Sequence, residues 1–265
     1  MLYFPQLSSG ALAQYPLRRS QKKRTIWNDC IDGSDVRLAD VGATTVEWHL
    51  PYSGLTQDEW QALIGLFQQT EGRLQTFSFF DPADNLLRYS GTLDNTIWVK
   101  DPLLQPLAGI IDPLGQTDAW QLTNAGSAPQ ALSQTIEIPG SYVCCFSAYA
   151  RSSSPVQITM TRTDSDAGIS SLQEIGPDWR RLQLSGSVGG AATSGTYSIS
   201  LPPGAVVDVF GLQVEAQPQP SDYKRTYSNC GVYPATRFAE DSLTTKAVAI
   251  NNYSVNISLT SRSAA

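Results

Sequence analysis

Charged side chains are scarce in this 265-residue sequence, in which Asp, Glu, Lys and Arg together make up 16%. Ordinary globular chains have about a quarter. The formal net charge is −6, which argues against a general nucleic-acid binder. No apolar run approaches the roughly 20 residues that a membrane span needs. The N-terminus, MLYFPQLSSG, lacks the basic and apolar regions of a secretion signal, so neither a membrane nor a secreted class is indicated.

Cysteine and histidine are also few. The four cysteines have no C-x-x-C spacing, which argues against zinc and thioredoxin-like sites. Cys144 and Cys145 are adjacent in an expected strand and would point to opposite faces. We expect all four to be small buried hydrophobes in a reducing compartment. His49 is the only histidine and lies in an expected strand, where a structural role is expected.

Signals for catalysis are thin. The sequence has no Gly-x-Ser-x-Gly motif, Walker loop or metal-ligand cluster. Asp164, Asp166, Asp208 and Glu215 are carboxylates that a glycoside hydrolase could use, but acid pairs occur by chance. The run from Asp164 to Gly168 lacks the closing glutamate of a calcium loop, so a turn is predicted there. We therefore expect no catalytic residue, metal or cofactor.

The first 84 residues predict strands around one amphipathic helix. Thr56-Gln57-Asp58-Glu59 is a capping box, after which apolar residues recur at helical spacing from Trp60 to Phe67, and Gly72 supplies a stop. Residues 45–50 alternate as a half-buried strand does, and residues 76–80 predict another strand.

The helical signal is absent between Asn85 and Thr226. Short alternating runs separated by turn residues are predicted as strands there: 120–123, 132–138, 142–151, 156–162, 180–185, 197–201 and 206–215. This pattern is typical of an antiparallel β-sandwich or jelly roll.

The C-terminal end predicts a hairpin beyond a short linker at residues 217–220. Residues 247–250 and 253–259 are joined by Asn251-Asn252. Two strands alone are not stable, so this hairpin must pack on the N-terminal part. The sequence thus predicts a mainly β protein with a discontinuous domain, residues 1–84 and 227–265, and an inserted domain, residues 85–226.

Several segments together resemble a known family: FPQLSSGALAQYPL, IDGSDVRLAD, VEWHLPYSGLTQDEW, the strand end FSFFDP and the closing AVAINNYSVNISL. In this order they resemble the distal tail protein of long-tailed bacteriophages. The resemblance implies a homo-oligomeric ring, expected to be a hexamer, that joins the tail tube protein to the baseplate hub. It also implies assembly in the host bacterial cytoplasm and a final place at the tail tip of the virion.

The inserted domain has a resemblance of its own. NLLRYSGTLDNTIWVK, IDPLGQTDAWQLTN, LSQTIEIPGSYVCCFSAYARS, PDWRRLQLSG and FGLQVEAQPQPSDYKRT are similar in order and spacing to carbohydrate-binding jelly rolls of phage structural proteins. The resemblance implies that the insert holds host-surface glycan. The insert is expected to project from the ring, where repetition would turn weak contacts into avidity.

Strand alternation selects the candidate glycan contacts. Leu182, Leu184, Phe210, Leu212 and Val214 are expected on one face of the strands. The opposite face would carry polar and aromatic side chains: Tyr149, Arg151, Arg181, Gln183, Gln213 and Glu215. Planar donors and acceptors beside an aromatic ring suit a sugar, although the face could equally be solvated or covered by a subunit. Trp179 precedes a strand at the rim and is a further candidate, whereas Trp98 and Trp120 are expected in the core.

A basic run precedes these elements. It is expected to be a loop that faces an acidic partner subunit. A solvated loop and a DNA contact are the alternatives. The charged residues of the run are Arg18, Arg19, Lys22, Lys23 and Arg24.

The sequence therefore predicts a structural protein of the phage tail tip with an inserted module for glycan adhesion, and no enzyme. Two alternatives stay open: a purely structural baseplate component whose insert braces neighbouring tail proteins, and a tail-associated glycoside hydrolase.

Overall fold

The computed structural model describes residues 1–165 and 167–262 and is mainly β, as the sequence predicts. It divides into two compact units. Unit 1 comprises residues 1–8, 12–80 and 232–265, and unit 2 comprises residues 9–11 and 81–231. Among the described residues, no helix has the length and apolar character to cross a membrane.

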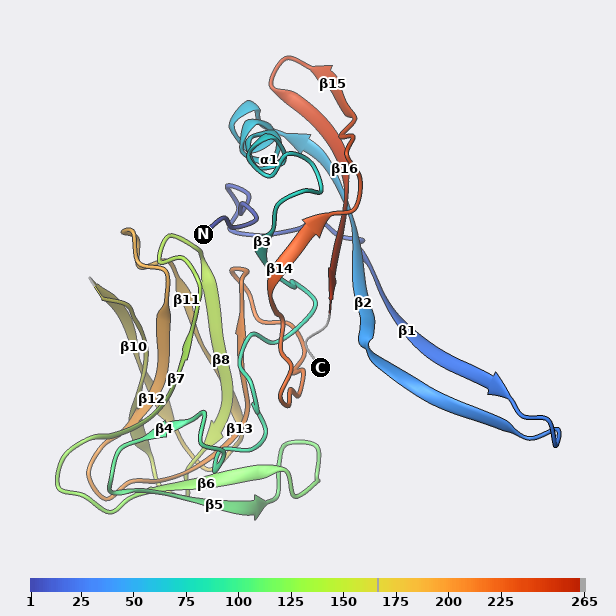
Figure 1. The fold of residues 1–265 in the computed structure, drawn as a ribbon. Coiled ribbons are helices and arrows are strands. Elements are labelled where there is room, and N and C mark those ends of the chain that lie inside the picture. Colours follow the sequence, from blue (N-terminus) through green and yellow to red (C-terminus); the bar gives the residue numbers. More distant parts are fainter. Residues whose placement is uncertain (166, 263–265) are drawn as a thin grey trace. The chain divides into compact units, whose positions relative to one another are not determined.

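Unit 1 is built on one antiparallel sheet with the strand order β1-β2-β16-β14-β3, and β15 pairs with β16 (Figure 1). Its strands are β1 (Arg18–Asp29), β2 (Asp35–Leu55), β3 (Phe77–Phe80), β14 (Val232–Phe238), β15 (Thr245–Ala249) and β16 (Asn252–Arg262). The expected C-terminal hairpin is present as β15 and β16, and Asn251 has the positive φ of 54° that its turn requires.

The helix α1 (Gln57–Gln69) begins at the expected capping box. The backbone N–H of Glu59 donates to Thr56 Oγ1 at 3.3 Å, and the backbone N–H of Thr56 donates to Glu59 Oε2 at 2.9 Å. The helix packs on the sheet through aromatic rings. Trp60 stacks on Tyr253 with ring centroids 4.5 Å apart, and Phe67 meets Phe238 edge-on at 5.0 Å. These ring contacts join the helix to β14 and β16.

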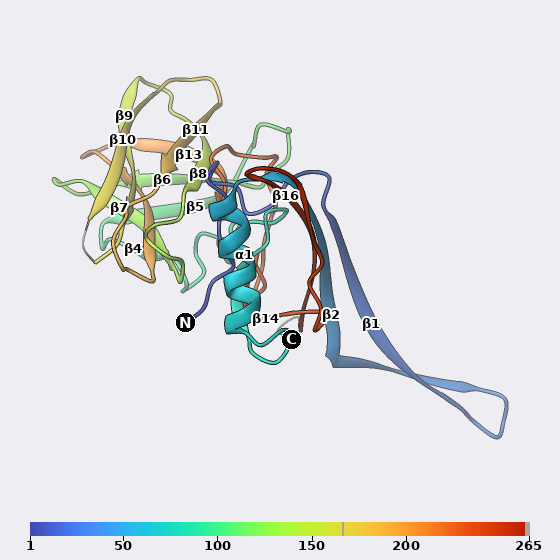
Figure 2. The ribbon, with the colours of Figure 1, turned by 90° about the horizontal axis from the view of Figure 1, so that it is seen from above.

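The distal half of the β1–β2 hairpin has no third strand. β16 pairs with residues 45–55 of β2, so residues 24–40 pair only with each other. We call residues 24–40 the arm. In Figures 1 and 2 it extends away from the remainder of unit 1. Its side chains are almost all exposed, including Ile26, Val36 and Leu38.

Unit 2 is a jelly-roll-like sandwich of two five-stranded antiparallel sheets, with orders β10-β9-β12-β7-β4 and β11-β8-β13-β6-β5. Its strands are β4 (Val99–Lys100), β5 (Leu104–Ile110), β6 (Ala119–Asn124), β7 (Gln130–Ile136), β8 (Cys144–Arg151), β9 (Val156–Thr163), β10 (Gly168–Ile175), β11 (Arg180–Gly186), β12 (Gly195–Leu201) and β13 (Val206–Glu215). All seven strands predicted for this region are present, and three more, β4, β5 and β10, were not predicted. β5 has irregular alternation with Pro106 and Gly109, and β10 has exposed polar residues with few apolar ones, so neither has the signal of a half-buried strand.

The two ends of unit 2 are tied together by the buried side chain of Asn85. Its Nδ2 donates to the carbonyl oxygens of Leu212 (3.0 Å) and Lys224 (3.1 Å), and its Oδ1 accepts from the amides of Leu87 and Val214. One amide group thus satisfies four backbone groups. The predicted division at residues 85 and 226 lies close to the unit boundaries, and the assignment of a ring domain and an inserted domain stays a prediction.

We call the four hydrogen bonds of the Asn85 side chain the clasp, and replacing this amide tests whether they stabilise unit 2. Asn85→Ala leaves buried backbone donors and acceptors unsatisfied, so we expect the unfolding free energy of unit 2 to fall by about 2–4 kcal/mol. Denaturant titration of the full chain, followed by tryptophan fluorescence, measures the change. Thr117→Ala, a truncation at an exposed loop position, is the control and should leave the midpoint unchanged. Equal midpoints for both variants would contradict the clasp.

Candidate functional site

The candidate site lies on the outer face of the sheet β11-β8-β13-β6-β5. Alternate residues of these strands, such as Phe146, Leu182 and Val214, are buried in the sandwich core, where Phe146 meets Tyr197 of the other sheet at 5.7 Å. Because strand neighbours alternate, the residues between them point to the outer face. Trp98 and Trp120 are buried, as expected for the core.

A β-bulge in β13 changes which residues share this face. Phe210 pairs with Tyr149, but the next pair in register is Gln213 with Ser147, so the bulge adds one residue to β13. Gly211, with φ of 66°, makes the bulge possible. The expectation that Phe210 faces the core is therefore wrong: its ring lies 6.1 Å from that of Tyr149 and 5.1 Å from that of Tyr223.

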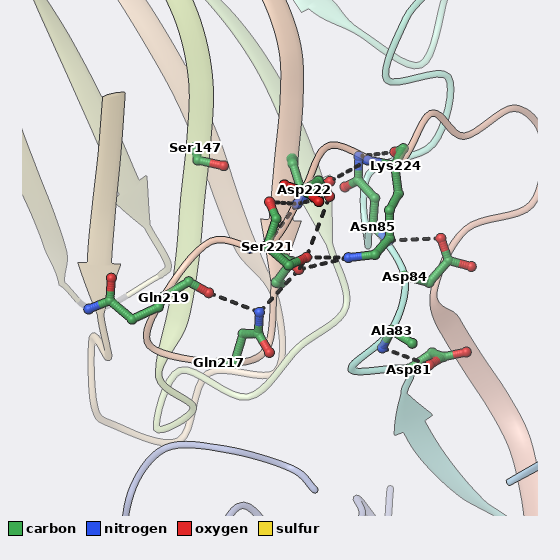
Figure 3. Close-up of polar contacts among 12 residues, drawn as sticks. Asp81, Ala83, Asp84, Asn85, Ser147, Gln217, Gln219, Ser221, Asp222 and Lys224 are labelled. Carbon is green, nitrogen blue, oxygen red and sulfur yellow. Dashed lines mark hydrogen bonds and ion pairs between the residues drawn. The ribbon is translucent and has the colours of Figure 1, made fainter. Parts of the chain in front are cut away.

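Two predicted glycan contacts, Gln213 and Glu215, are fully buried on this face. They bind residues 217–226, which we call the strap. Figure 3 shows strap residues Gln217, Ser221 and Lys224. Gln213 Nε2 donates to the carbonyl oxygens of Ser221 (3.2 Å) and Asp222 (3.3 Å), and its Oε1 accepts from the amide of Lys224 (2.7 Å). In this arrangement both side chains bind the strap and present no surface to a ligand.

Glu215 completes the attachment of the strap. Its Oε2 accepts from the amide of Ser221 at 2.9 Å, and its Oε1 lies 3.2 Å from Lys224 Nζ. Gln217 Nε2 donates to Oε1 at 3.1 Å. A buried carboxylate needs such partners, because its desolvation is costly without them. The expectation of a linker at residues 217–220 is wrong, since this stretch folds back onto unit 2 and Ser185 Oγ donates to Pro218 O.

Four other side chains form an accessible group on the same face. Arg151 Nε donates to Asp208 Oδ2 at 2.9 Å, and its guanidinium lies over the Trp179 ring at 4.8 Å. Gln121 Nε2 donates to Asp208 Oδ1 at 3.1 Å. We call Gln121, Arg151, Trp179 and Asp208 the Arg151 cluster. All four are half-buried, so each keeps part of its surface for a ligand.

The predicted contacts Tyr149, Arg181 and Gln183 flank the Arg151 cluster. Tyr149 and Arg181 are half-buried cross-strand partners, and the guanidinium lies 5.3 Å from the tyrosine ring. Arg181 Nη2 donates to Ser147 Oγ at 3.1 Å and to the carbonyl oxygen of Ser221 in the strap. Gln183 is exposed. Arg181 therefore contacts both the strap and the open part of the face.

Sequence reasoning overlooked Gln121 and considered Asp208 only as a carboxylate for catalysis. Gln121 lies at an outward position of β6, and Asp208 is the cross-strand partner of Arg151 in β8. The alternation of β6 could have indicated Gln121. The pairing of Asp208 with Arg151 depends on strand register, which the sequence does not give.

Hydrolysis would require two carboxylates at a separation of roughly 5 to 9.5 Å. Asp208 and Glu215 lie seven positions apart on β13, and a strand of that length spans roughly 20 Å. These two cannot act as a pair. Asp164 accepts from the amide of Ala167 in the β9–β10 turn, where a turn is predicted, and Asp166 lies outside the described residues. Within the described ranges, no group of three or more His, Cys, Asp or Glu side chains could hold a metal ion.

The basic run is not a loop. Arg18, Arg19, Lys22, Lys23 and Arg24 all belong to strand β1. Antiparallel pairing with β2 places Lys22 Nζ 2.7 Å from Glu47 Oε1 and Arg24 Nη1 3.6 Å from Asp40 Oδ2. The loop prediction failed because charged residues lower strand propensity only weakly when a long partner strand is available.

The comparisons with known proteins found similarities to solved structures. No protein-family model matches the chain, and no curated protein matches it. The CBM22-1 xylan-binding domain from Paenibacillus barcinonensis Xyn10C is similar at 16% identity and a TM-score of 0.42, covering 53% of this chain and 99% of that one. TmCBM61 in complex with β-1,4-galactotriose is similar at 16% identity and a TM-score of 0.37, covering 49% and 97%.

A phage protein is also among the similar structures. The enzymatically active domain of tailspike protein 4 of bacteriophage CBA120 is 14% identical with a TM-score of 0.41, covering 52% of this chain. The match covers only 22% of that tailspike chain. At these identities and TM-scores, the likenesses do not argue for a function by themselves.

The two thiols of β8 give a direct test of burial at this site. Burial raises the pKa of Cys145 to about 12, with the nearby Glu215 adding to the shift and Arg181 opposing it. Burial likewise raises the pKa of Cys144. Because a thiolate is the reactive form, we expect both to resist a disulfide-exchange reagent at pH 8 while the half-buried Cys30 and Cys230 react.

Spectrophotometric thiol counting checks this expectation before and after denaturation. Two thiols should react in the folded chain and four in the unfolded chain, and Cys30→Ser should remove one of the fast pair. Rapid reaction of all four in the folded chain would contradict the burial of the two β8 thiols.

Proposed function

We propose that this chain is a structural protein of a phage tail tip, which forms a ring through unit 1 and binds host-surface glycan through unit 2. The Arg151 cluster is the observation that carries the glycan part. The resemblance of the terminal segments to distal tail proteins supports the tail-tip part, and the arm supports assembly.

The chemistry of the Arg151 cluster suits a neutral sugar. A pyranose ring presents apolar C–H faces together with hydroxyl groups that both donate and accept hydrogen bonds. Trp179 offers an aromatic surface, Arg151 and Gln121 offer donors, and Asp208 and Gln121 offer acceptors. The ion pair holds the carboxylate and the guanidinium in fixed positions, so their side-chain entropy is already lost before a ligand binds.

Few such contacts in one half-open site give weak binding. A ring would carry one site for each copy, and simultaneous engagement would raise the effective affinity by orders of magnitude without any new contact. Weak single sites and a multivalent assembly are therefore consistent with each other.

The arm supports assembly because it is not stable by itself. A two-stranded hairpin is marginal in water unless it packs on another surface. Ile26 and Leu38 are direct cross-strand partners, and Val36 lies two residue pairs further along, on the same face of the arm. This face of the arm is apolar and exposed, and a neighbouring subunit that covers it would stabilise the hairpin. Head-to-tail contacts of this kind close into rings.

Two alternatives make different predictions. If the insert only braces neighbouring tail proteins, the Arg151 cluster would contact protein, and the isolated chain would bind no glycan. A glycoside hydrolase would release reducing ends from host polysaccharide.

Glycan-array and host cell-wall binding by the full chain tests the adhesive function. We expect Trp179→Ala and Asp208→Ala each to weaken binding about tenfold, which is the loss of roughly 1.4 kcal/mol. Loss of Asp208 also frees Arg151 from its ion pair. Tyr227→Ala removes an exposed aromatic ring outside the cluster and is the matched control. Equal binding by all four proteins, or no binding by the wild type, would count against glycan adhesion.

Assembly is tested by removing the arm. Replacement of residues 25–39 by Asn-Gly shortens the hairpin while keeping a turn that favours it. We expect the variant to lose self-association, as measured by sedimentation velocity, while circular dichroism retains the β spectrum. Undiminished assembly of the shortened chain would exclude the arm as the contact.

A further inference from the structure

Unit 1 has a groove on the face of its sheet that carries His49 and Ser258, across strands β2 and β16. Its volume is about 350 Å³. Its lining includes the apolar residues Pro16, Leu17 and Pro51, whereas Leu50 and Ile257, which also border it, alternate with His49 and Ser258 and are buried on the other face of the sheet. A concavity of this size and character is suited to an apolar side chain or a small ligand.

The polar part of the lining is cationic or neutral. It consists of Arg18, His49, Asn256 and Ser258, and no acidic residue is among the lining residues. His49 Nδ1 and Ser258 Oγ lie 3.0 Å apart, so they satisfy each other. Arg18 is exposed and has no ion pair among the described residues. The groove therefore offers the apolar side chains of Pro16, Leu17 and Pro51 beside one uncompensated positive charge, that of Arg18.

The tip of the arm has the opposite character. Ile31 is fully exposed in the turn between β1 and β2, and three carboxylates surround it in the chain: Asp29, Asp32 and Asp35. Arg37 neutralises Asp35, at 2.6 Å. The hydroxyl and the amide of Ser34 donate to Asp32 and lower its pKa, so this carboxylate is charged at neutral pH. The tip therefore presents one apolar side chain, that of Ile31, between the carboxylates of Asp29, Asp32 and Asp35. We call these three carboxylates the acidic collar.

Two carboxylates of the collar lie opposite each other. Asp29 and Asp35 are direct cross-strand partners at the last rung of the hairpin. Arg37 offsets the charge of Asp35, so Asp29 and Asp32 are the carboxylates that a cation from another molecule would neutralise.

The tip cannot reach the groove of its own chain. β1 begins at Arg18, beside the groove, and continues for 12 residues to Asp29. At a rise of about 3.3 Å per residue, this strand holds the tip roughly 36 Å from the groove. An occupant from this chain's own sequence must therefore come from a second copy.

We infer that Ile31 of one copy inserts into the β2–β16 groove of the next copy, with its acidic collar against Arg18. The tip and the groove are different surfaces, so each copy uses both and the contact is head-to-tail, as ring closure requires. The inference rests on the proposed ring and names its contact. It is independent of glycan binding, because the groove and the arm both belong to unit 1.

Self-association of the full chain, measured by sedimentation velocity over a range of concentrations, tests this contact. Ile31→Ser should weaken association at least tenfold without affecting the fold, because the side chain is fully exposed. Arg18→Glu should weaken it similarly, and Asp32→Arg combined with Arg18→Glu should restore association beyond the sum of the single effects. Leu172→Ala, at an exposed apolar position in unit 2, is the control and should assemble like the wild type.

Cross-linking gives a second measurement. With Cys30→Ser as background, Ile31→Cys together with Asn256→Cys should form disulfides between copies under mild oxidation, seen as a ladder in a non-reducing gel. Ile31→Cys with Thr117→Cys, a position in unit 2, is the control pair and should not form it.

The outcomes separate the two proposals. If Ile31→Ser assembles like the wild type while the shortened arm does not, this docking is wrong and the ring proposal stands. A wild-type chain that stays monomeric at every concentration would overturn both.

Discussion

The pairing of β3 with β14 is the constraint on which the organisation of the chain depends. Phe80 and Val232 are cross-strand partners, so the chain leaves unit 1 and returns to it at neighbouring positions of one sheet. A long insertion at such a point costs little loop-closure entropy, because its ends are already held together. Unit 2 matches this constraint with a clasp of its own: Asn85 binds backbone groups of β13 and of the exit segment.

Within unit 2, Gly211 and the strap determine which side chains on the outer face of the sheet are accessible to a ligand. The bulge at Gly211 brings Phe210 to the outer face, where its ring meets Tyr149 and Tyr223. The strap then buries Gln213 and Glu215, since each can satisfy its polar atoms only through residues 217–226 or its own neighbours on β13. What remains open is the Arg151 cluster. The half-buried ion pair there contributes little stability by itself, and its value is to hold an acceptor and a donor in place beside an aromatic ring.

Unit 1 shows the opposite balance, with well-buried aromatic packing at one end and an unsupported hairpin at the other. The rings around α1 anchor the sheet, whereas the arm exposes apolar side chains on one face and places two carboxylates opposite each other at its last rung. Natural proteins retain exposed hairpins of this kind where another molecule covers them. The charge distribution of the chain, with a basic β1 and an acidic tip, also distinguishes the two ends of the arm electrostatically, which favours one orientation of contact over the other.

The sequence alone determined those features that depend on local periodicity and capping. The helix and its capping box, seven of the strands in unit 2 and the C-terminal hairpin follow from patterns within a few residues of each other. Register, bulges and burial were decided only by the tertiary structure. The sequence could not show that Phe210 shares a face with Tyr149, because a single extra residue in β13 reverses the alternation beyond it. Nor could it show that the basic run forms a strand, since that depends on Glu47 and Asp40 farther along the chain. That Glu215 is covered depends on the strap folding back over β13, which local pattern does not indicate.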